Sequence, residues 1–176
     1  MLFNDIENVK EKQMENKALY VLAGYDDETE SRLAGIQNGL YEKGFTGVHT
    51  KNLPQHITMH SFPTDQEEAL IEKVKKISSE TKAFEVVFSH IGIFTGGEVL
   101  FIAPDKNAPL LRLKEEFGDS NSWTPHTTML IDKPDVICKA LPLVTESFSD
   151  FCGKVTSLHL YEFFPTRYIT TVELQH

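Results

Sequence analysis

The chain contains the same short pattern of chemically active side chains twice, as His56-Ile57-Thr58-Met59 and as His126-Thr127-Thr128-Met129. Each copy follows a proline, Pro54 in the first and Pro125 in the second. A β-strand points alternate side chains to the same face, so the histidine and the threonine of each copy would lie side by side. Two such strands facing each other would combine two imidazoles with two hydroxyl groups. This set of groups suits acid/base cleavage of a phosphate ester without a metal.

The repetition of the pattern is what makes it informative. One copy alone would be weak evidence, because threonine is common in strands. The two histidines are 70 residues apart (126 − 56), so only the fold can bring them together. Because each copy follows a proline and precedes a predicted helix, we favour a shared site over two ordinary strand segments.

Length and composition indicate a globular protein. A chain of 176 residues suits a single domain, or one domain made of two similar lobes. Its 40% hydrophobic and 24% charged residues are typical of soluble proteins. We predict an N-terminal extension or helix over residues 1–17 and a single two-lobed domain over residues 18–176. Cys138 and Cys152 fit neither a CxxC pair nor a disulfide framework, and reduced core thiols are the simpler interpretation.

The charge and the N-terminus limit the classes of partner. A net charge of −9 argues against a protein that wraps long nucleic acid, because phosphate contacts need a basic surface. It favours a small nucleotide substrate or the end of an RNA. The N-terminus has acidic residues where a signal peptide has basic ones, and no window reaches the ~20 apolar residues of a membrane span. We therefore predict a cytoplasmic protein with no membrane partner.

Hydrophobic spacing predicts the same element order in both halves of the chain: strand, helix, His/Thr strand, helix, strand. In the first half, a strand over 18–23 precedes a helix that starts at Asp27, with Glu30 three residues later in the spacing of a first capping box. A capping box over residues 64–67 is predicted to open the next helix, before a strand over 84–94. Gly96-Gly97 has the chemistry of a tight hairpin turn, and nothing after it resembles a phosphate-binding loop.

The second half continues with a strand over 99–102 and a helix over 106–117 before the second His/Thr copy. Pro134 suits the first position of another helix, and Pro142 is expected to kink it. Closing strands are predicted over 155–163 and 168–174. The prediction is an α+β fold with two pseudo-symmetric lobes around a central cleft, each lobe an antiparallel-type sheet packed with helices.

On these residues the chain resembles the two-histidine (2H) phosphoesterase superfamily, near the bacterial 2′-5′ RNA ligase and cyclic-nucleotide phosphodiesterase group. His56, Thr58, His126 and Thr128 carry the resemblance, and the element order matches from about residue 18 to residue 174. The resemblance implies two similar lobes, a central cleft lined by both motifs, and neither metal nor cofactor. It also implies that the histidines are the acid/base pair and the threonines the phosphate binders.

The chain departs from the family pattern at three positions. Thr127 stands where the family usually has an apolar residue, and Met59 and Met129 stand where leucine is more usual. These residues fall on the opposite strand face from the histidines and threonines, so the chemistry should be unaffected.

The pattern leads to one principal function and two alternatives. The principal one is metal-independent hydrolysis of a 2′,3′-cyclic phosphate or a related phosphodiester, in which one neutral and one protonated imidazole share the proton transfers. The first alternative is a binding module that holds a nucleotide or RNA end without turning it over. The second is a 2′-5′ RNA-end ligase, in which a hydroxyl-bearing RNA end replaces water.

Other residues have a possible role in the site and a more ordinary interpretation. His60 would share a face with His56 on a continuing strand, although a strand-end position is the simpler interpretation. The HxxxH spacing of these two residues occurs in zinc helices, but Pro54 and the β-branched Ile57 and Thr58 disfavour a helix here.

Aromatic and basic residues near the motifs have the same two interpretations. Trp123 and Tyr168 are candidates for stacking on a nucleobase, with packing as the ordinary interpretation. Arg167 is placed in a solvated turn in preference to a phosphate contact. His90 and His159 are interpreted as packed or surface strand residues.

Overall fold

The computed structural model describes residues 17–48, 51 and 53–176. The predicted N-terminal extension, apart from Lys17, lies outside these residues. The elements in chain order are β1 (Ala18–Tyr25), α2 (Asp27–Glu42), β2 (His56–Phe62), the 3₁₀ helix η1 (Thr64–Gln66), α3 (Glu67–Glu80), β3 (Phe84–Ile93), β4 (Val99–Pro104), α4 (Ala108–Glu115), β5 (Thr127–Ile131), α5 (Pro134–Ser147), β6 (Phe151–Phe163) and β7 (Arg167–Glu173).

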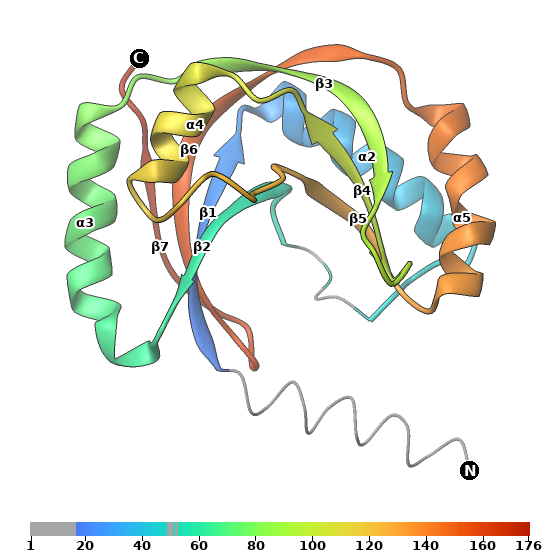
Figure 1. Cartoon of the computed structure of the whole chain (residues 1–176), viewed down its shortest axis with the longest axis horizontal. Coiled ribbons are helices and arrows are strands. Elements are labelled where there is room, and N and C mark those ends of the chain that lie inside the picture. The colour runs from blue at the N-terminus through green and yellow to red at the C-terminus, as the bar shows by residue number, and fades with distance from the viewer. Residues whose placement is uncertain (1–16, 49–50, 52) are drawn as a thin grey trace.

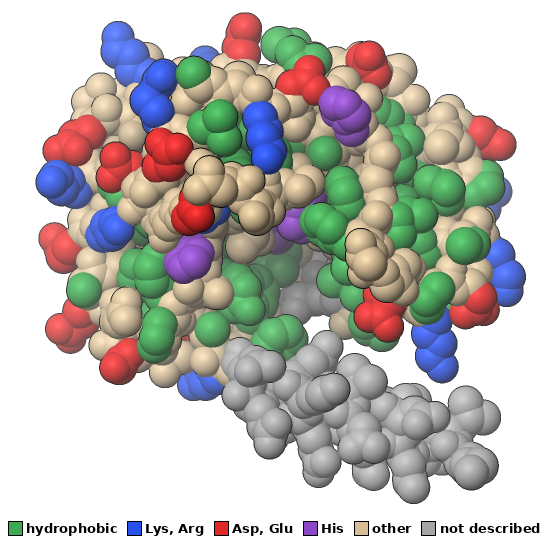
Figure 2. Space-filling view, in the orientation of Figure 1, with side chains coloured by type: hydrophobic (Ala, Val, Ile, Leu, Met, Phe, Trp, Pro, Cys, Tyr) green, Lys and Arg blue, Asp and Glu red, His purple; other side chains and the backbone are tan. Residues whose placement is uncertain are grey.

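In the described part of the chain, a seven-stranded antiparallel sheet forms the centre of the fold, in the order β2-β1-β6-β3-β4-β5 with β7 paired to β6. The helices lie in two groups, α3 with α4 and α2 with α5, on either side of the molecule (Figure 1). A hollow between these two sides is visible in the space-filling view (Figure 2). The predicted α+β, two-lobed architecture is confirmed, and the two lobes are the halves of one continuous sheet.

The spatial lobes do not coincide with the halves of the sequence. Strand β6 belongs to the second half of the chain, but its residues 155–163 pair with β1, which belongs to the first half. The same strand pairs with β3 over residues 151–155, while β3 pairs with β4. Because β6 runs through both lobes, their relative position is determined by main-chain hydrogen bonds and not by a linker.

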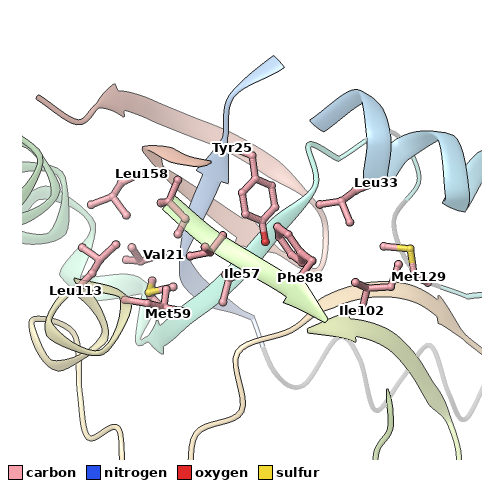
Figure 3. Close-up of a cluster of buried hydrophobic side chains, with 14 of the residues drawn as sticks. Val21, Tyr25, Leu33, Ile57, Met59, Phe88, Ile102, Leu113, Met129 and Leu158 are labelled. Atoms are coloured by element: carbon pink, nitrogen blue, oxygen red, sulfur yellow. The ribbon is translucent and has the colours of Figure 1, made fainter. Parts of the chain in front are cut away.

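The core determines which face of each motif strand meets solvent. Ile57 and Met59 of β2 and Met129 of β5 are at most 1% exposed and pack among the residues of the helix-covered core (Figure 3). Burial of each such side chain contributes about 1.5–3 kcal/mol, and a one-residue slip in register would expose all of them. The histidines and threonines that alternate with these residues are therefore directed to the opposite face.

The start of α2 is capped differently from the prediction. Asp26, and not Asp27, is the capping residue, and its carboxylate accepts a hydrogen bond from the Thr29 amide at 3.0 Å. Glu30 does not close a capping box. Its carboxylate instead accepts the main-chain N–H of Gln55 at 2.8 Å and 2.9 Å, directly before β2.

The second predicted capping box, over residues 64–67, was wrong. Residues 64–66 form the short 3₁₀ helix η1, and neither η1 nor α3 has a side-chain cap. The residues that were expected to cap α3 form η1 instead, which follows Pro63 directly.

Of the other local predictions, the glycine turn and the first position of α5 were correct. Gly96 and Gly97 have positive φ angles of 102° and 75° in the β3–β4 turn, a conformation that favours glycine. Pro134 begins α5, which continues through Pro142. Both cysteines are unpaired as expected, but they are exposed and not part of the core. Within the described segments, no helix is long and apolar enough to cross a membrane.

Candidate active site

The two motif strands lie at opposite ends of the sheet order, and the curvature of the sheet brings them close together. A cavity of about 240 Å³ opens between them, in the region of the hollow seen in Figure 2. His56, Thr58 and Thr128 line it. The full lining is Tyr20, Gln37, Val48, Leu53, Pro54, Gln55, His56, Thr58, Thr127, Thr128, Ile131, Phe163 and Phe164. His126 is not a lining residue, although its positive charge, when present, lowers the pKa of His56.

The two histidine rings are held in the same way. The Nδ1 atom of His56 lies 2.7 Å from the carbonyl oxygen of Pro54, and Nδ1 of His126 lies 2.9 Å from that of Thr124. A carbonyl only accepts hydrogen bonds, so each Nδ1 must carry the proton and donate it. In the neutral ring, Nε2 is then an unprotonated acceptor. Each motif therefore presents one basic nitrogen, oriented by the residue two positions upstream.

The surroundings of both rings favour the neutral form. Burial lowers the pKa of His56, the Pro54 carbonyl opposes this shift, and the charge of His126 lowers the pKa further. Burial also lowers the pKa of His126, against the opposing hydrogen bond to Thr124. Because each positive charge disfavours the other, the pair favours a state with at most one imidazolium.

The two threonine hydroxyls of the motifs are available to a ligand. In the described part of the chain, no protein group hydrogen-bonds the hydroxyl of Thr58 or Thr128. The neighbouring Thr127 differs, because its hydroxyl is buried on the core face and lies 2.6 Å from the hydroxyl of Tyr25. This bond explains how a polar residue occupies a position where an apolar one was expected.

The main-chain carbonyls of the same two threonines are bound from elsewhere in the fold. The indole Nε1 of Trp123 donates to the carbonyl of Thr58 at 3.2 Å. The side-chain amide of Gln37 donates to the carbonyl of Thr128 at 3.1 Å. Trp123 was a candidate for base stacking, and the structure instead packs it against the core.

His159 is a third histidine on the cleft face, which the sequence did not identify. It pairs with Leu22 of β1, and Leu22 pairs with Thr58, so His159 and Thr58 point to the same side of the sheet. Its Nδ1 lies 2.8 Å from the Thr171 hydroxyl and its Nε2 lies 3.3 Å from that of Ser157. Burial, together with the charge of His56, lowers the pKa of His159 to about 4. Only the strand pairing shows that His159 lies near the first motif, because a single histidine in an alternating strand does not by itself predict a functional site.

Aromatic rings surround the second histidine. The ring centroids of Phe94 and Phe101 lie 4.7 Å and 5.4 Å from that of His126. Phe101 itself lies over Gly92, where a Cβ would come within 2.3 Å of its ring. These contacts restrict the orientation of the His126 ring.

His60 does not join the site. A bulge shifts the β1–β2 register so that Leu22 pairs with Thr58 but Val21 pairs with His60, which interrupts the alternation of faces. The His60 ring packs edge-on against Phe62 at 4.9 Å, and this histidine is not a lining residue of the cavity. Since β2 is a strand, the HxxxH spacing does not have the helical geometry of a zinc site.

Three other candidates lie outside the site. The Arg167 guanidinium is paired with Glu67 and Glu162, so it is occupied by carboxylates. Tyr168 is 57% exposed and contacts Tyr161 at 5.5 Å between ring centroids. His90 is exposed on β3.

Sequence comparison identifies the family. Residues 26–163 match the sequence profile of the 2′-5′ RNA ligase superfamily. The chain belongs to this family. No curated protein matches it significantly. Membership supports a phosphodiesterase-type enzyme, and the predicted resemblance to two-histidine phosphoesterases is confirmed.

Solved structures share the fold at low sequence identity. E. coli LigT in its apo form is 15% identical, with a TM-score of 0.60 over 91% of this chain and 98% of LigT. LigT complexed with 3′-AMP is 16% identical, with a TM-score of 0.60 over 91% of this chain and 99% of LigT. TT0787 of Thermus thermophilus is 14% identical, with a TM-score of 0.62 over 90% of this chain and 98% of TT0787. At these identities the likeness establishes the common architecture.

Proposed function

We propose that the protein hydrolyses a 2′,3′-cyclic phosphate, or a related phosphodiester of a nucleotide or RNA end, without a metal or cofactor. His56 and His126 are the acid/base pair, and Thr58 and Thr128 bind the phosphate. The observation that carries this proposal is the matched pair of Nδ1 hydrogen bonds, at 2.7 Å and 2.9 Å, which leaves each Nε2 available for proton transfer.

The reaction assigns one proton transfer to each ring. A neutral imidazole takes a proton through Nε2 from the water that attacks phosphorus, while the other imidazole, protonated, gives its proton to the departing ribose oxygen. One phosphorus–oxygen bond forms to water and one breaks to the ribose, which yields a phosphate monoester. Each transfer is worth about 10²–10⁴ in rate. At ~1.4 kcal/mol per factor of ten, this corresponds to about 3–5 kcal/mol of barrier.

The threonines would stabilise the charge that develops on the phosphate. Their hydroxyls have no protein partner among the described residues, and they project from the same strand faces as the histidines. Hydrogen bonds from Thr58 and Thr128 to the non-bridging oxygens would strengthen as negative charge develops there.

The cavity suits a nucleotide or a strand end. Its volume of about 240 Å³ is small, and Tyr20, Phe163 and Phe164 supply aromatic surface on which a base can stack. E. coli LigT, a structural relative, has been crystallised with 3′-AMP. A nucleotide of the same class is the expected ligand of this cavity.

The test is a panel of 2′,3′-cyclic nucleotides and 2′-5′ linked dinucleotides, assayed with and without EDTA. We expect hydrolysis that EDTA leaves unchanged and a bell-shaped pH–rate profile. A folded His56→Ala or His126→Ala variant with full activity would contradict the proposed roles. Tight binding of a cyclic nucleotide with no product would instead indicate a binding module.

The family profile also favours a second candidate, 2′-5′ ligation of RNA ends. A hydroxyl of one RNA end would replace water as the attacking group, so the histidine that takes a proton from water in hydrolysis would take it from this hydroxyl instead. Chromatography of the products formed from paired RNA ends distinguishes ligation from hydrolysis.

A further inference from the structure

The two motif strands have no main-chain hydrogen bonds to each other. Both β2 and β5 end the sheet order, so each has an edge beside which no strand of the described residues lies. On these edges, the carbonyl of Thr58 accepts from Trp123 at 3.2 Å, and the carbonyl of Thr128 accepts from Gln37 at 3.1 Å. The same Gln37 amide lies 3.2 Å from the next carbonyl, that of Met129. The main chain at both phosphate-binding positions is thus held by a side chain from outside the sheet.

Gln37 connects the second motif to the first. Its side-chain oxygen accepts a hydrogen bond at 2.8 Å from the side-chain amide of Gln55, the residue directly before His56. Gln55 is only 5% exposed, and its main-chain N–H is bound by Glu30. Glu30 and Gln37 lie about two turns apart on α2, so one face of this helix holds the approach to β2 and the edge of β5 together.

Trp123 makes the reciprocal connection. It precedes His126 by three residues, in the segment whose Thr124 carbonyl orients the His126 ring. Its indole reaches across to Thr58 on β2. The segment before the first motif is therefore connected through Gln55 and Gln37 to the Thr128 carbonyl. The segment before the second motif is connected through Trp123 to the Thr58 carbonyl.

We propose that Trp123 and Gln37 are positioning residues that set the distance between the two His/Thr pairs. The inference rests on the proposed function, because it concerns a phosphate held by Thr58 and Thr128 at once. Such a site needs its groups held within about 0.5 Å, and a displacement of about 1 Å can cost about 10² in rate. Without these two donors, β2 and β5 would still be related by the curvature of the six-strand path and by the Tyr25–Thr127 hydrogen bond, but neither of these holds the Thr58 or Thr128 carbonyl.

The test combines two positioning variants with two threonine variants. Trp123→Phe keeps an aromatic ring but has no N–H, and Gln37→Glu keeps the shape but has no donor for the Thr128 carbonyl. We expect each to lower kcat/KM on a 2′,3′-cyclic nucleotide by about 10- to 100-fold. Gln66→Glu, the same change at an exposed glutamine before α3, is the matched control for Gln37→Glu and should have no effect.

The double variants provide the specific signature. If Trp123 acts through Thr58, Trp123→Phe should have little further effect in a Thr58→Val background but its full effect in a Thr128→Val background. Gln37→Glu should show the opposite pattern. A general loss of stability would lower activity equally in both backgrounds, so the crossed pattern separates positioning from a merely structural role.

For the same set of variants, calorimetry measures the Kd for inorganic phosphate. This measurement does not depend on turnover. The crossed pattern in Kd with no hydrolysis would support the positioning role and contradict the proposed reaction. Equal effects in both backgrounds, with wild-type hydrolysis intact, would overturn the positioning role alone. Absence of both hydrolysis and phosphate binding would overturn both proposals.

Discussion

The imidazole of His159 lies directly over Gly24, the β1 residue that pairs with His56. A Cβ built on Gly24 would come within 2.0 Å of Nε2 of His159 and within 2.5 Å of the Ser157 hydroxyl. In the sheet, Gly24 pairs with His56 on one side and with Ser157 on the other. The absence of a side chain at this one position therefore allows a third imidazole to lie beside the first motif, on the same face of the sheet.

Gly24→Ala should displace the His159 ring and destabilise the fold by about 1–3 kcal/mol, as expected for overpacking. Urea unfolding measures this loss. In the double variant Gly24→Ala/His159→Ala the ring is gone, so we expect much of the lost stability to return. Equal stabilities of Gly24→Ala and the wild type would show that the ring moves aside at no cost.

Replacing either of the two histidines proposed as the acid/base pair should remove most of the activity. His56→Ala and His126→Ala are each expected to lower kcat on a 2′,3′-cyclic nucleotide by about 10²–10⁴. The double variant should lose much less than the product of the two effects, because the rings act as a unit. His90→Ala, an exposed histidine on β3, serves as the control, and circular dichroism checks that every variant is folded.

Stability should fall in acid because of the buried imidazoles. The pKa of His159 is lowered to about 4, below the ordinary value of 6.5, so the unfolded chain binds more protons between these two values. Unfolding free energy should therefore be highest above pH 6.5 and decrease as the pH falls toward 4. At about 1.4 kcal/mol per pH unit, His159 contributes a loss of the order of 2–3 kcal/mol.

Urea unfolding at several pH values, compared between the wild type and His159→Gln, measures the His159 contribution. The variant should show a shallower decline. The part that remains belongs to the other groups whose pKa is lowered, among them His56, His126 and the carboxylates of Glu67 and Glu162. A decline of the same steepness in His159→Gln would show that this ring does not titrate as expected.

Removing only one hydroxyl of the buried Tyr25–Thr127 pair should lower the free energy of unfolding more than removing both. The two oxygens lie 2.6 Å apart, and Thr127 is 1% exposed. Thr127→Val leaves the Tyr25 hydroxyl without a partner and should cost about 1–3 kcal/mol, while Tyr25→Phe/Thr127→Val removes both groups and should cost less. Unfolding free energies of the single and double variants test this, and a double variant as unstable as the sum of the single ones would contradict it.

The chemistry-bearing residues and their faces could be predicted from the sequence because both depend on local alternation. Apolar Ile57, Met59 and Met129 alternate with the motif residues, and their burial directs the histidines and threonines away from the core. Strict alternation would place His60 on the motif face, but a bulge in β2 interrupts the alternation immediately after the motif, and His60 lies exposed near the end of the strand, as the simpler interpretation expected. Nothing in the local sequence marks a bulge, which arises from the register between β2 and its partner strand.

The sequence by itself determined the strand and helix segments, the glycine turn at Gly96-Gly97 and the two His/Thr pairs, since periodicity and turn chemistry act over a few residues. Only the tertiary structure decided that β6 connects both lobes, that His159 lies over Gly24, and that Trp123 and Gln37 bind the carbonyls of the two threonines. These relationships join segments far apart in the chain, such as the 65 residues between Thr58 and Trp123. They depend on strand order and register, which are set by the packing of the whole sheet and not by any one segment.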